Sequence, residues 1–359
     1  ISLSARLTEM LAPEGMVRVM FSSGGSDAVE TALKLARQFW KLEGRGTKTK
    51  IFSLKNGYHG VHFGGMSASG NPLWRLAYEP LLQGFHQVEG PYLYRNPFTD
   101  DHEELGELCA QLLAREIENQ GAETVAAFIA EPIQGAGGLI VPPPNFWPRL
   151  REVCDQYDIL FIADEIVTGF GRTGTLFGSR HWGVKPDIMC FAKGINSGYV
   201  PLGATAVNAR VAAAWERDHP LAAIMHGYTY TGHPVACAAA LANLDIVENE
   251  DLTGNARKQG AYFLSGLETI RDRFPSVGDV RGCGLMLGIE FVRDKATKEP
   301  YPPNDPFCLE VQRVCREQGA MLRIQGNKMI ISPPLVFRRE HVDTALGAIT
   351  TALETVDVR

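Results

Sequence analysis

The spacing of hydrophobic positions changes along the chain, and these changes outline its elements. Between residues 50 and 250, short apolar runs alternate with stretches in which apolar residues recur at helical spacing. Three of these runs, Thr124–Ala130, Ile159–Ala163 and Asp187–Ala192, carry almost no polar residue, which is typical of strands buried on both faces of a parallel sheet. The alternation predicts an α/β fold with a mostly parallel, doubly wound sheet.

The two ends of the chain follow other patterns. The first 40 residues predict a helix, a strand over Val17–Phe21, a glycine-rich turn over Ser22–Ser26 and a second helix, which Ser26 or Asp27 could cap. Beyond about residue 250, a polar helix is followed by short strands and a closing helix. We expect a large domain over residues 1–250 and a small C-terminal α/β domain over residues 251–359.

The composition is that of an ordinary globular protein, with 45% hydrophobic and 21% charged residues and a net charge of −6. This charge offers no basic face for nucleic acid. No apolar run is long enough to predict a membrane-spanning helix, and the first residues do not resemble a signal peptide. The seven cysteines contain no CxxC pair, so we expect reduced thiols, no metal site and a cytoplasmic protein.

Ionisable residues directly follow the three apolar runs: Glu131, Asp164 and Lys193. Ligands of open α/β sheets bind outside the carboxyl ends of the strands. A single lysine in such a place is most often a solvated loop residue. Two acids and a lysine at one edge of a sheet instead suit a cofactor, a metal or a charged substrate.

The turn Ser22–Ser26 adds a candidate anion site, because a glycine-rich turn before a helix presents backbone N–H groups. The same residues also suit a plain tight turn. The turn lacks the GxGxxG spacing of dinucleotide sites and the Lys-Ser/Thr ending of triphosphate loops, so it fits one phosphate monoester. A lysine that could form a Schiff base, an aspartate that could pair with a ring nitrogen and a phosphate cradle together suggest pyridoxal phosphate.

Seven segments also match a known family in their order and cover nearly the whole chain. They are Phe21–Ala28, Tyr58–Gly60, Glu131–Gly135, Ala163–Gly174, Ala192–Gly194, Thr229–Pro234 and Ser332–Leu335. With these segments the chain resembles the class III pyridoxal-phosphate-dependent aminotransferases, the family of ω-amino acid and amine:pyruvate transaminases. The resemblance implies a fold of the pyridoxal-phosphate fold type I, in which the large domain binds the cofactor.

The resemblance also implies roles for individual residues. Lys193 matches the lysine that forms the Schiff base, and Asp164 matches the partner of the pyridine nitrogen. Further implied cofactor contacts are Gly25 and Ser26 at the phosphate, Tyr58 and Ile166 at the two ring faces, Glu131 near the cofactor and substrate, and Thr229 at the phosphate. Arg323 matches a mobile arginine that binds the substrate carboxylate.

The match departs from the family at several positions. Gly24 stands where the family commonly has serine, Ile166 where valine is commoner, and Ile324 where a proline usually follows the mobile arginine. Family members also carry several dozen residues before the segment that matches the start of this chain, so we expect an N-terminal part to be missing from it. His59, beside Tyr58, is interpreted as a packed or backbone-bonded histidine rather than an acid–base group.

The resemblance implies transfer of an amino group from an ω-amino acid or amine to a keto acid, with pyruvate as the expected acceptor and ping-pong kinetics. Because the family's counterpart of Thr229 reaches the partner's cofactor, it also implies a homodimer with a shared active site, or a tetramer of such subunits. Other pyridoxal-phosphate reactions on the same scaffold stay open: an aminomutase, a racemase or a decarboxylating transaminase. A non-catalytic binding protein and a nicotinamide dehydrogenase agree less well with the motifs. The physiological amine and the enantiopreference are left open.

Overall fold

The computed structural model describes residues 1–357, which form two compact units. The first unit consists of Ile1–Gly137, Pro142–Phe170 and Phe177–Asn249. The second consists of Gly138–Val141, Gly171–Leu176 and the segment that starts at Glu250. Two short pieces from the middle of the chain therefore pack with the C-terminal part.

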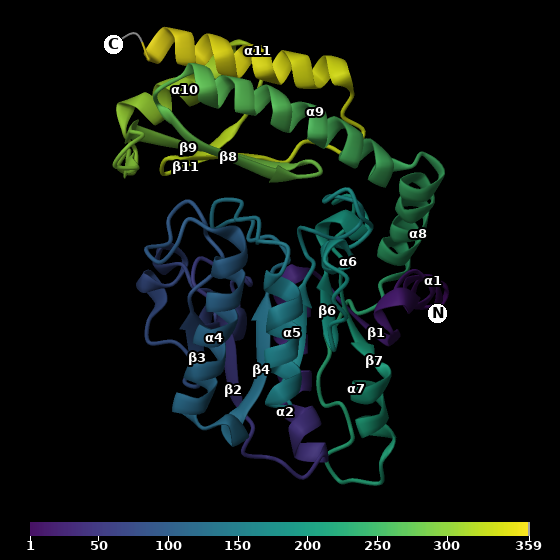
Figure 1. Ribbon diagram of the computed structural model, residues 1–359. Coiled ribbons are helices and arrows are strands. Elements are labelled where there is room, and N and C mark those ends of the chain that lie inside the picture. Colours follow the sequence, from purple (N-terminus) through teal and green to yellow (C-terminus); the bar gives the residue numbers. More distant parts are fainter. Residues whose placement is uncertain (358–359) are drawn as a thin grey trace. The chain divides into compact units, whose positions relative to one another are not determined.

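A seven-stranded sheet in the order β1-β7-β6-β5-β4-β2-β3 forms the centre of the first unit (Figure 1). Its strands are β1 (Met16–Ser22), β2 (Lys50–Leu54), β3 (Phe85–Val88), β4 (Val125–Ala130), β5 (Leu160–Asp164), β6 (Ile188–Phe191) and β7 (Gly203–Asn208). Strands β3, β2, β4, β5 and β6 pair in parallel, whereas β7 pairs antiparallel with both β6 and β1. Strand β1 therefore runs in the same direction as β6, and both strands end at the same edge of the sheet.

Helices cover both faces of this sheet. Strands β4, β5 and β6 are buried along their whole length, as their continuous apolar runs predicted. Helix α2 (Gly25–Leu42) packs on one face against Leu160 and Ile162. Helices α4 (His102–Gln120) and α5 (Phe146–Gln156) lie on the other face (Figure 1), where the rings of Trp147 and Phe161 are 5.4 Å apart.

The remaining helices of the first unit are shorter or lie at its margin. They are α1 (Ser2–Met10), α3 (Phe63–Ala68), α6 (Gly178–His181), α7 (Ala209–Ala213) and α8 (Pro234–Asn249). Single 3-10 turns occur at Ala12–Glu14, Pro72–Trp74, Leu76–Tyr78, Ala122–Thr124, Lys193–Ile195 and Ala214–Glu216. No helix among residues 1–357 is both long and apolar enough to cross a membrane.

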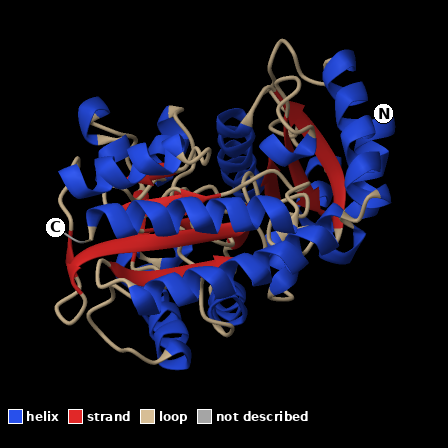
Figure 2. Ribbon diagram, turned by 90° about the horizontal axis from the view of Figure 1, so that it is seen from above, coloured by secondary structure: helices blue, strands red, loops and turns tan. Residues whose placement is uncertain are grey.

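The second unit is built on a five-stranded antiparallel sheet. Strands β10 (Glu299–Pro300), β9 (Met286–Asp294), β12 (Lys328–Ile331) and β11 (Arg323–Gln325) follow one another, and β8 (Val277–Cys283) also pairs with β9. Helices α9 (Leu252–Arg273), α10 (Pro306–Glu317) and α11 (Arg339–Val356) pack over the sheet and share its apolar core. Figure 2 distinguishes the helices, strands and loops of both units. The mostly parallel large sheet and the separate small sheet confirm the predicted α/β class.

The start of helix α2 differs from the prediction. Neither Ser26 nor Asp27 occupies the N-cap position, which belongs to Gly24, and among the described residues no side-chain hydrogen bond caps this helix. The Asp27 carboxylate instead accepts a hydrogen bond from the backbone N–H of Ser23 at 3.0 Å. The hydroxyl of Ser26 accepts one from the N–H of Val61 at 3.1 Å. Both side chains therefore hold neighbouring loops rather than capping the helix.

Candidate active site

The carboxyl edge of the large sheet brings the three predicted ionisable residues to adjacent strand ends. Strand β4 pairs with β5 up to Ala130 and Ala163, and Glu131 and Asp164 come next. Asp164 pairs with Cys190 of β6, and Lys193 follows three positions later. Because β1 runs in the same direction as β6, the glycine turn that follows β1 opens at this same edge.

Lys193 has a strained backbone and an amine that has no partner among residues 1–357. Its φ is +42°, a region that costs a residue with a β-carbon about 1–3 kcal/mol. The surrounding turn is held in place by Asn243, whose side-chain amide donates to the carbonyls of Gly194 at 2.9 Å and Ile195 at 3.2 Å. The side chain of Lys193 is exposed, and no residue within 1–357 forms an ion pair or hydrogen bond with it. Strain that the fold maintains at an exposed lysine points to a functional role.

Asp164 is buried and oriented by two groups. One carboxylate oxygen accepts from the N–H of Ile166 at 3.2 Å, and the other lies 2.8 Å from Nδ1 of His59. His59 is 1% exposed, and its other ring nitrogen, Nε2, has no hydrogen-bond partner among the described residues. His59 is thus packed, as expected, but its ring bonds to Asp164 and not to the backbone. Sequence reasoning missed this pair, because the two residues are 105 positions apart.

A second buried acid, Glu165, fixes the loop that carries Ile166. Its carboxylate accepts from the N–H groups of Gly178 at 2.8 Å and Ser179 at 2.7 Å, which belong to the first turn of α6. The hydroxyl of Thr168 donates to it at 2.5 Å. Burial raises the pKa of Glu165 against the effect of these donors. The sequence places Glu165 in a family-like motif but gave no sign of this anchoring role.

Glu131 links the end of β4 to the loop that contains Tyr58. Its two carboxylate oxygens accept from the N–H of Tyr58 at 3.0 Å and the N–H of Gly135 at 2.9 Å. Burial raises the pKa of Glu131 to about 7, in spite of the opposing effect of nearby His59. A carboxyl group with such a pKa exchanges a proton near neutral pH.

The glycine turn forms a close-packed cradle at the start of α2. A β-carbon placed on Gly25 would lie 3.0 Å from Cδ1 of Ile166, and one on Gly60, whose φ is +108°, would lie 2.7 Å from the hydroxyl of Ser26. The turn, the loop at Gly60 and the side chain of Ile166 therefore meet closely. The first N–H groups of an α-helix have no partner within the helix, so this cradle can accept an anion.

The three other predicted residues lie in different settings. The ring of Tyr58 packs edge-on against Trp74, with 5.3 Å between the centroids; sequence reasoning missed Trp74. Thr229 is exposed in a turn of the first unit, directly after Tyr228. Arg323 is an exposed residue of the second unit, where it begins β11 and donates to the side chain of Gln325 at 2.9 Å.

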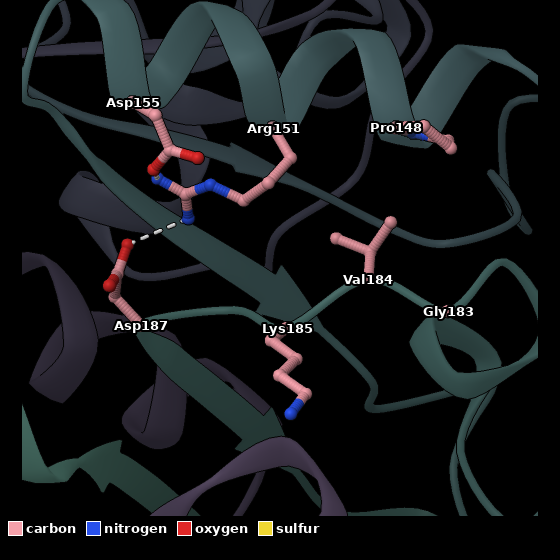
Figure 3. Close-up of a pocket in the computed structure, with 7 residues that line it drawn as sticks. All are labelled: Pro148, Arg151, Asp155, Gly183, Val184, Lys185 and Asp187. Atoms are coloured by element: carbon pink, nitrogen blue, oxygen red, sulfur yellow. Dashed lines mark hydrogen bonds and ion pairs between the residues drawn. The ribbon is translucent and has the colours of Figure 1, made fainter.

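A pocket on the first unit lies at the opposite ends of the strands, where β6 begins (Figure 3). Arg151 lines it and is already paired with Asp187 at 2.9 Å and Asp155 at 2.7 Å. Lys185, an exposed residue, also lines this pocket. None of the predicted site residues lines this pocket. Among residues 1–357, no group of three or more His, Cys, Asp or Glu side chains is placed to hold a metal ion.

Comparison with known proteins gives consistent matches over the whole chain. A family model described as aminotransferase class-III matches residues 1–353. The putrescine–pyruvate aminotransferase of Pseudomonas aeruginosa is 39% identical, with 97% of this chain and 75% of that protein covered. The omega-aminotransferase of Caulobacter vibrioides is 37% identical, with 99% and 79% covered.

Solved structures match equally well. An amine transaminase from an uncultivated Pseudomonas species, in its PLP-bound form, has a TM-score of 0.97 and 52% identity, with 99% of this chain and 80% of that chain covered. An (S)-enantioselective omega-transaminase from Thermomicrobium roseum has a TM-score of 0.94 and 44% identity, with 99% and 78% covered.

Proposed function

The chain belongs to the class III aminotransferase family, and from this premise we propose that it transfers an amino group from an ω-amino acid or amine to pyruvate by a ping-pong mechanism. The family and the PLP-bound neighbour indicate pyridoxal phosphate as the cofactor. The observation that carries the proposal is the placement of Lys193 and Asp164 at the ends of two adjacent parallel strands. Lys193 stands on strained backbone and has no ion pair with the described residues, and Asp164 is a buried acid.

The described residues fit this cofactor in three respects. Within residues 1–357, the glycine turn leaves the first N–H groups of α2 free for a phosphate, and its packing against Ile166 leaves little room for a β-carbon at Gly25. Asp164 is buried and held by His59, as the partner of a protonated ring nitrogen must be. The amine of Lys193 has no ion pair with the described chain, so it is available for an aldehyde.

Each residue then has a distinct task. When bound, pyridoxal phosphate supplies an aldehyde that condenses with amines and a ring that withdraws electrons from the neighbouring carbon. Lys193 would hold the aldehyde and, once released, would move a proton at the substrate carbon. Asp164 would keep the ring nitrogen protonated. Gly25 and Ser26 would bind the phosphate.

The remaining predicted residues would line the cofactor and the substrate. Tyr58 and Ile166 would cover the two ring faces, and Glu131 would lie near the cofactor and the substrate. Arg323 would bind the carboxylate of pyruvate, because a guanidinium can bind a carboxylate through two parallel hydrogen bonds. The two substrates would use one site in turn, which gives ping-pong kinetics.

Alanine formation from pyruvate and a panel of amines tests this function. The wild-type protein is expected to form alanine and Lys193→Ala none. Lys185→Ala is expected to form the wild-type amount, because Lys185 is also an exposed lysine but lies at the other ends of the strands. Double-reciprocal plots of initial rate against amine concentration, recorded at several fixed pyruvate concentrations, give parallel lines for a ping-pong mechanism. A product that forms from the amine without any keto acid would instead favour a mutase or racemase.

We also infer a homodimer in which Thr229 completes the phosphate site of the partner subunit. Two observations support this. Thr229 is exposed, and the segment around it carries a run of exposed large apolar side chains: Leu221, Ile224, Met225, Tyr230 and Val235. Exposed apolar surface of this kind marks interfaces. None of the seven cysteines, all of which lie within residues 1–357, forms a disulfide, which favours a reducing compartment such as the cytoplasm.

Subunit mixing tests the shared site. Lys193→Ala and Thr229→Ala proteins are each expected to be weakly active or inactive. If Thr229 acts across the interface, a mixed dimer carries one site with both defects and one intact site, so mixing restores activity. If Thr229 acts within its own subunit, both sites of a mixed dimer are defective and mixing restores nothing.

A further inference from the structure

Asp27 joins three separate segments at the first turn of α2. Its carboxylate accepts from the N–H of Ser23 at 3.0 Å and lies 2.8 Å from Nε2 of His62. Its backbone carbonyl accepts from the hydroxyl of Tyr228 at 3.0 Å. The side chain is only 16% exposed. The glycine turn, the loop 58–62 and the loop 226–229 therefore all bond to this one residue.

Three further contacts attach the same loops to the same helix. The N–H of Val61 donates to the hydroxyl of Ser26 at 3.1 Å. The hydroxyl of Thr31 lies 2.9 Å from Nε2 of His226, and Nζ of Lys34 lies 3.4 Å from Nδ1 of the same ring. The helix thus holds each loop through more than one residue, and Asp27 takes part in the attachment of both loops. Charge-assisted hydrogen bonds of a largely buried carboxylate are the stronger members of such a set.

We propose that Asp27 is a positioning residue. Before the cofactor binds, it holds the phosphate end of its own subunit's site and the loop that carries Thr229 toward the site of the partner subunit. The proposal rests on the proposed function, because it takes Ser26, Tyr58 and Thr229 as cofactor contacts. Each of the three segments carries one of these residues. Tyr58 lies in the loop that His62 attaches, and Thr229 directly follows Tyr228.

The charge of Asp27 allows two explanations to be separated, because they predict opposite changes in cofactor binding when the charge is removed. A carboxylate at the start of α2 repels the phosphate that the cradle would bind. If charge were its main effect, Asp27→Asn would strengthen cofactor binding. Asparagine has nearly the same shape but carries no charge and has a single acceptor oxygen. The bonds to Ser23 and His62 therefore lose their charge assistance, even where the amide nitrogen of asparagine donates to Nε2 of His62. Positioning therefore predicts the opposite result, weaker binding.

The release rate of pyridoxal phosphate shows whether Asp27→Asn binds the cofactor more weakly or more tightly than the wild type. Holoprotein is diluted and the loss of its protein-bound cofactor absorbance is followed with time. Asp27→Asn is expected to release the cofactor about tenfold faster than the wild type, the effect of losing one hydrogen bond to a charged group. Asp101→Asn is the matched control, because Asp101 caps α4 through the N–H of Glu104, away from all three segments. Its release rate is expected to be that of the wild type.

Amide hydrogen exchange in the apoprotein separates assembly of the site from an effect on bound cofactor. Asp27→Asn is expected to speed exchange in segment 58–62, which the side chain holds through His62. It should leave segment 226–229 unchanged, because Tyr228 bonds to the backbone carbonyl that the variant keeps. Asp101→Asn is expected to leave both segments unchanged. Release at the wild-type rate or slower overturns the proposal. Faster release with unchanged exchange in the apoprotein also overturns it, because the loops would then be positioned without Asp27.

Single-bond variants keep the test available if Asp27→Asn does not fold. Tyr228→Phe is expected to speed exchange only in segment 226–229, and His62→Gln only in segment 58–62. Unchanged exchange in both variants contradicts the proposal. These apoprotein measurements do not require the cofactor to attach at Lys193, so a failure of the proposed function is seen separately, as a wild-type protein that does not bind pyridoxal phosphate.

Discussion

Replacement of His59 tests the support of the buried acid at position 164. In His59→Leu the Asp164 oxygen that lies 2.8 Å from Nδ1 of His59 loses this partner. Both side chains are almost fully buried, so water does not readily replace the lost bond. A buried hydrogen bond to a charged group is worth about 1.5–3 kcal/mol. A loss of about 2 kcal/mol corresponds to a fall of roughly 4–8 °C in melting temperature for a domain of about this size.

The position of the contact also predicts which substitution restores it. The bonded atom is Nδ1, the ring nitrogen nearer the backbone, and Nε2 has no partner among the described residues. The side-chain amide of asparagine reaches about as far from the backbone as Nδ1 does. His59→Asn is therefore expected to recover most of the stability and turnover that His59→Leu loses.

Thermal unfolding of the apoprotein and turnover with a saturating amine are the assays. His102→Leu is the control, because His102 is an exposed histidine at the start of α4, and it should behave like the wild type. Wild-type stability and turnover in His59→Leu would refute the reasoning. So would an asparagine variant that performs no better than the leucine variant.

Three other substitutions test separate parts of the site. The folded protein holds a proton on Glu131 up to about pH 7, whereas an unfolded glutamate releases it near pH 4.3. The stability of the wild type should therefore fall as the pH rises from about 4.5 to 7. In Glu131→Gln, the melting temperature followed over this range should lack the part of the fall that Glu131 causes. Gly25→Ala should weaken pyridoxal phosphate binding, because its β-carbon would lie 3.0 Å from Cδ1 of Ile166. Titration of the apoprotein should show that binding recovers in part when Ile166→Val is added, because this change removes the Cδ1 atom. Equal binding by Gly25→Ala and the wild type would contradict the packing argument. Arg323→Gln should raise the KM for pyruvate about tenfold or more and leave the KM for an amine without a carboxylate unchanged. Arg316 is an exposed arginine of α10, and the control variant Arg316→Gln should change neither KM.

The edge of the large sheet could be predicted because its strands carry an unusually clear pattern. Continuous apolar runs indicated β4, β5 and β6, and the residues after these runs had to meet at one edge once the strands were parallel. The placement of Glu131, Asp164 and Lys193 thus required only local patterns and one general rule of α/β folds.

Contacts between distant segments could not be predicted in this way. The pairing of His59 with Asp164 joins a loop and a strand end 105 positions apart, and the ring of Trp74 meets Tyr58 through an irregular segment without periodicity. The cap of α2 was predicted wrongly because Ser26 and Asp27 have suitable side chains, yet the loops near Val61 and His62 use them instead. Whether Thr229 and Arg323 act as the resemblance implies stays a prediction.

The attachment site of the cofactor tests the central claim most directly. Borohydride reduction of the holoprotein fixes pyridoxal phosphate to whichever lysine holds its aldehyde, and peptide mass spectrometry then identifies that lysine. The account predicts that the added mass lies on the peptide containing Lys193 and is absent from the one containing Lys185. A label on any other lysine, or no label on a protein that binds the cofactor, would contradict it.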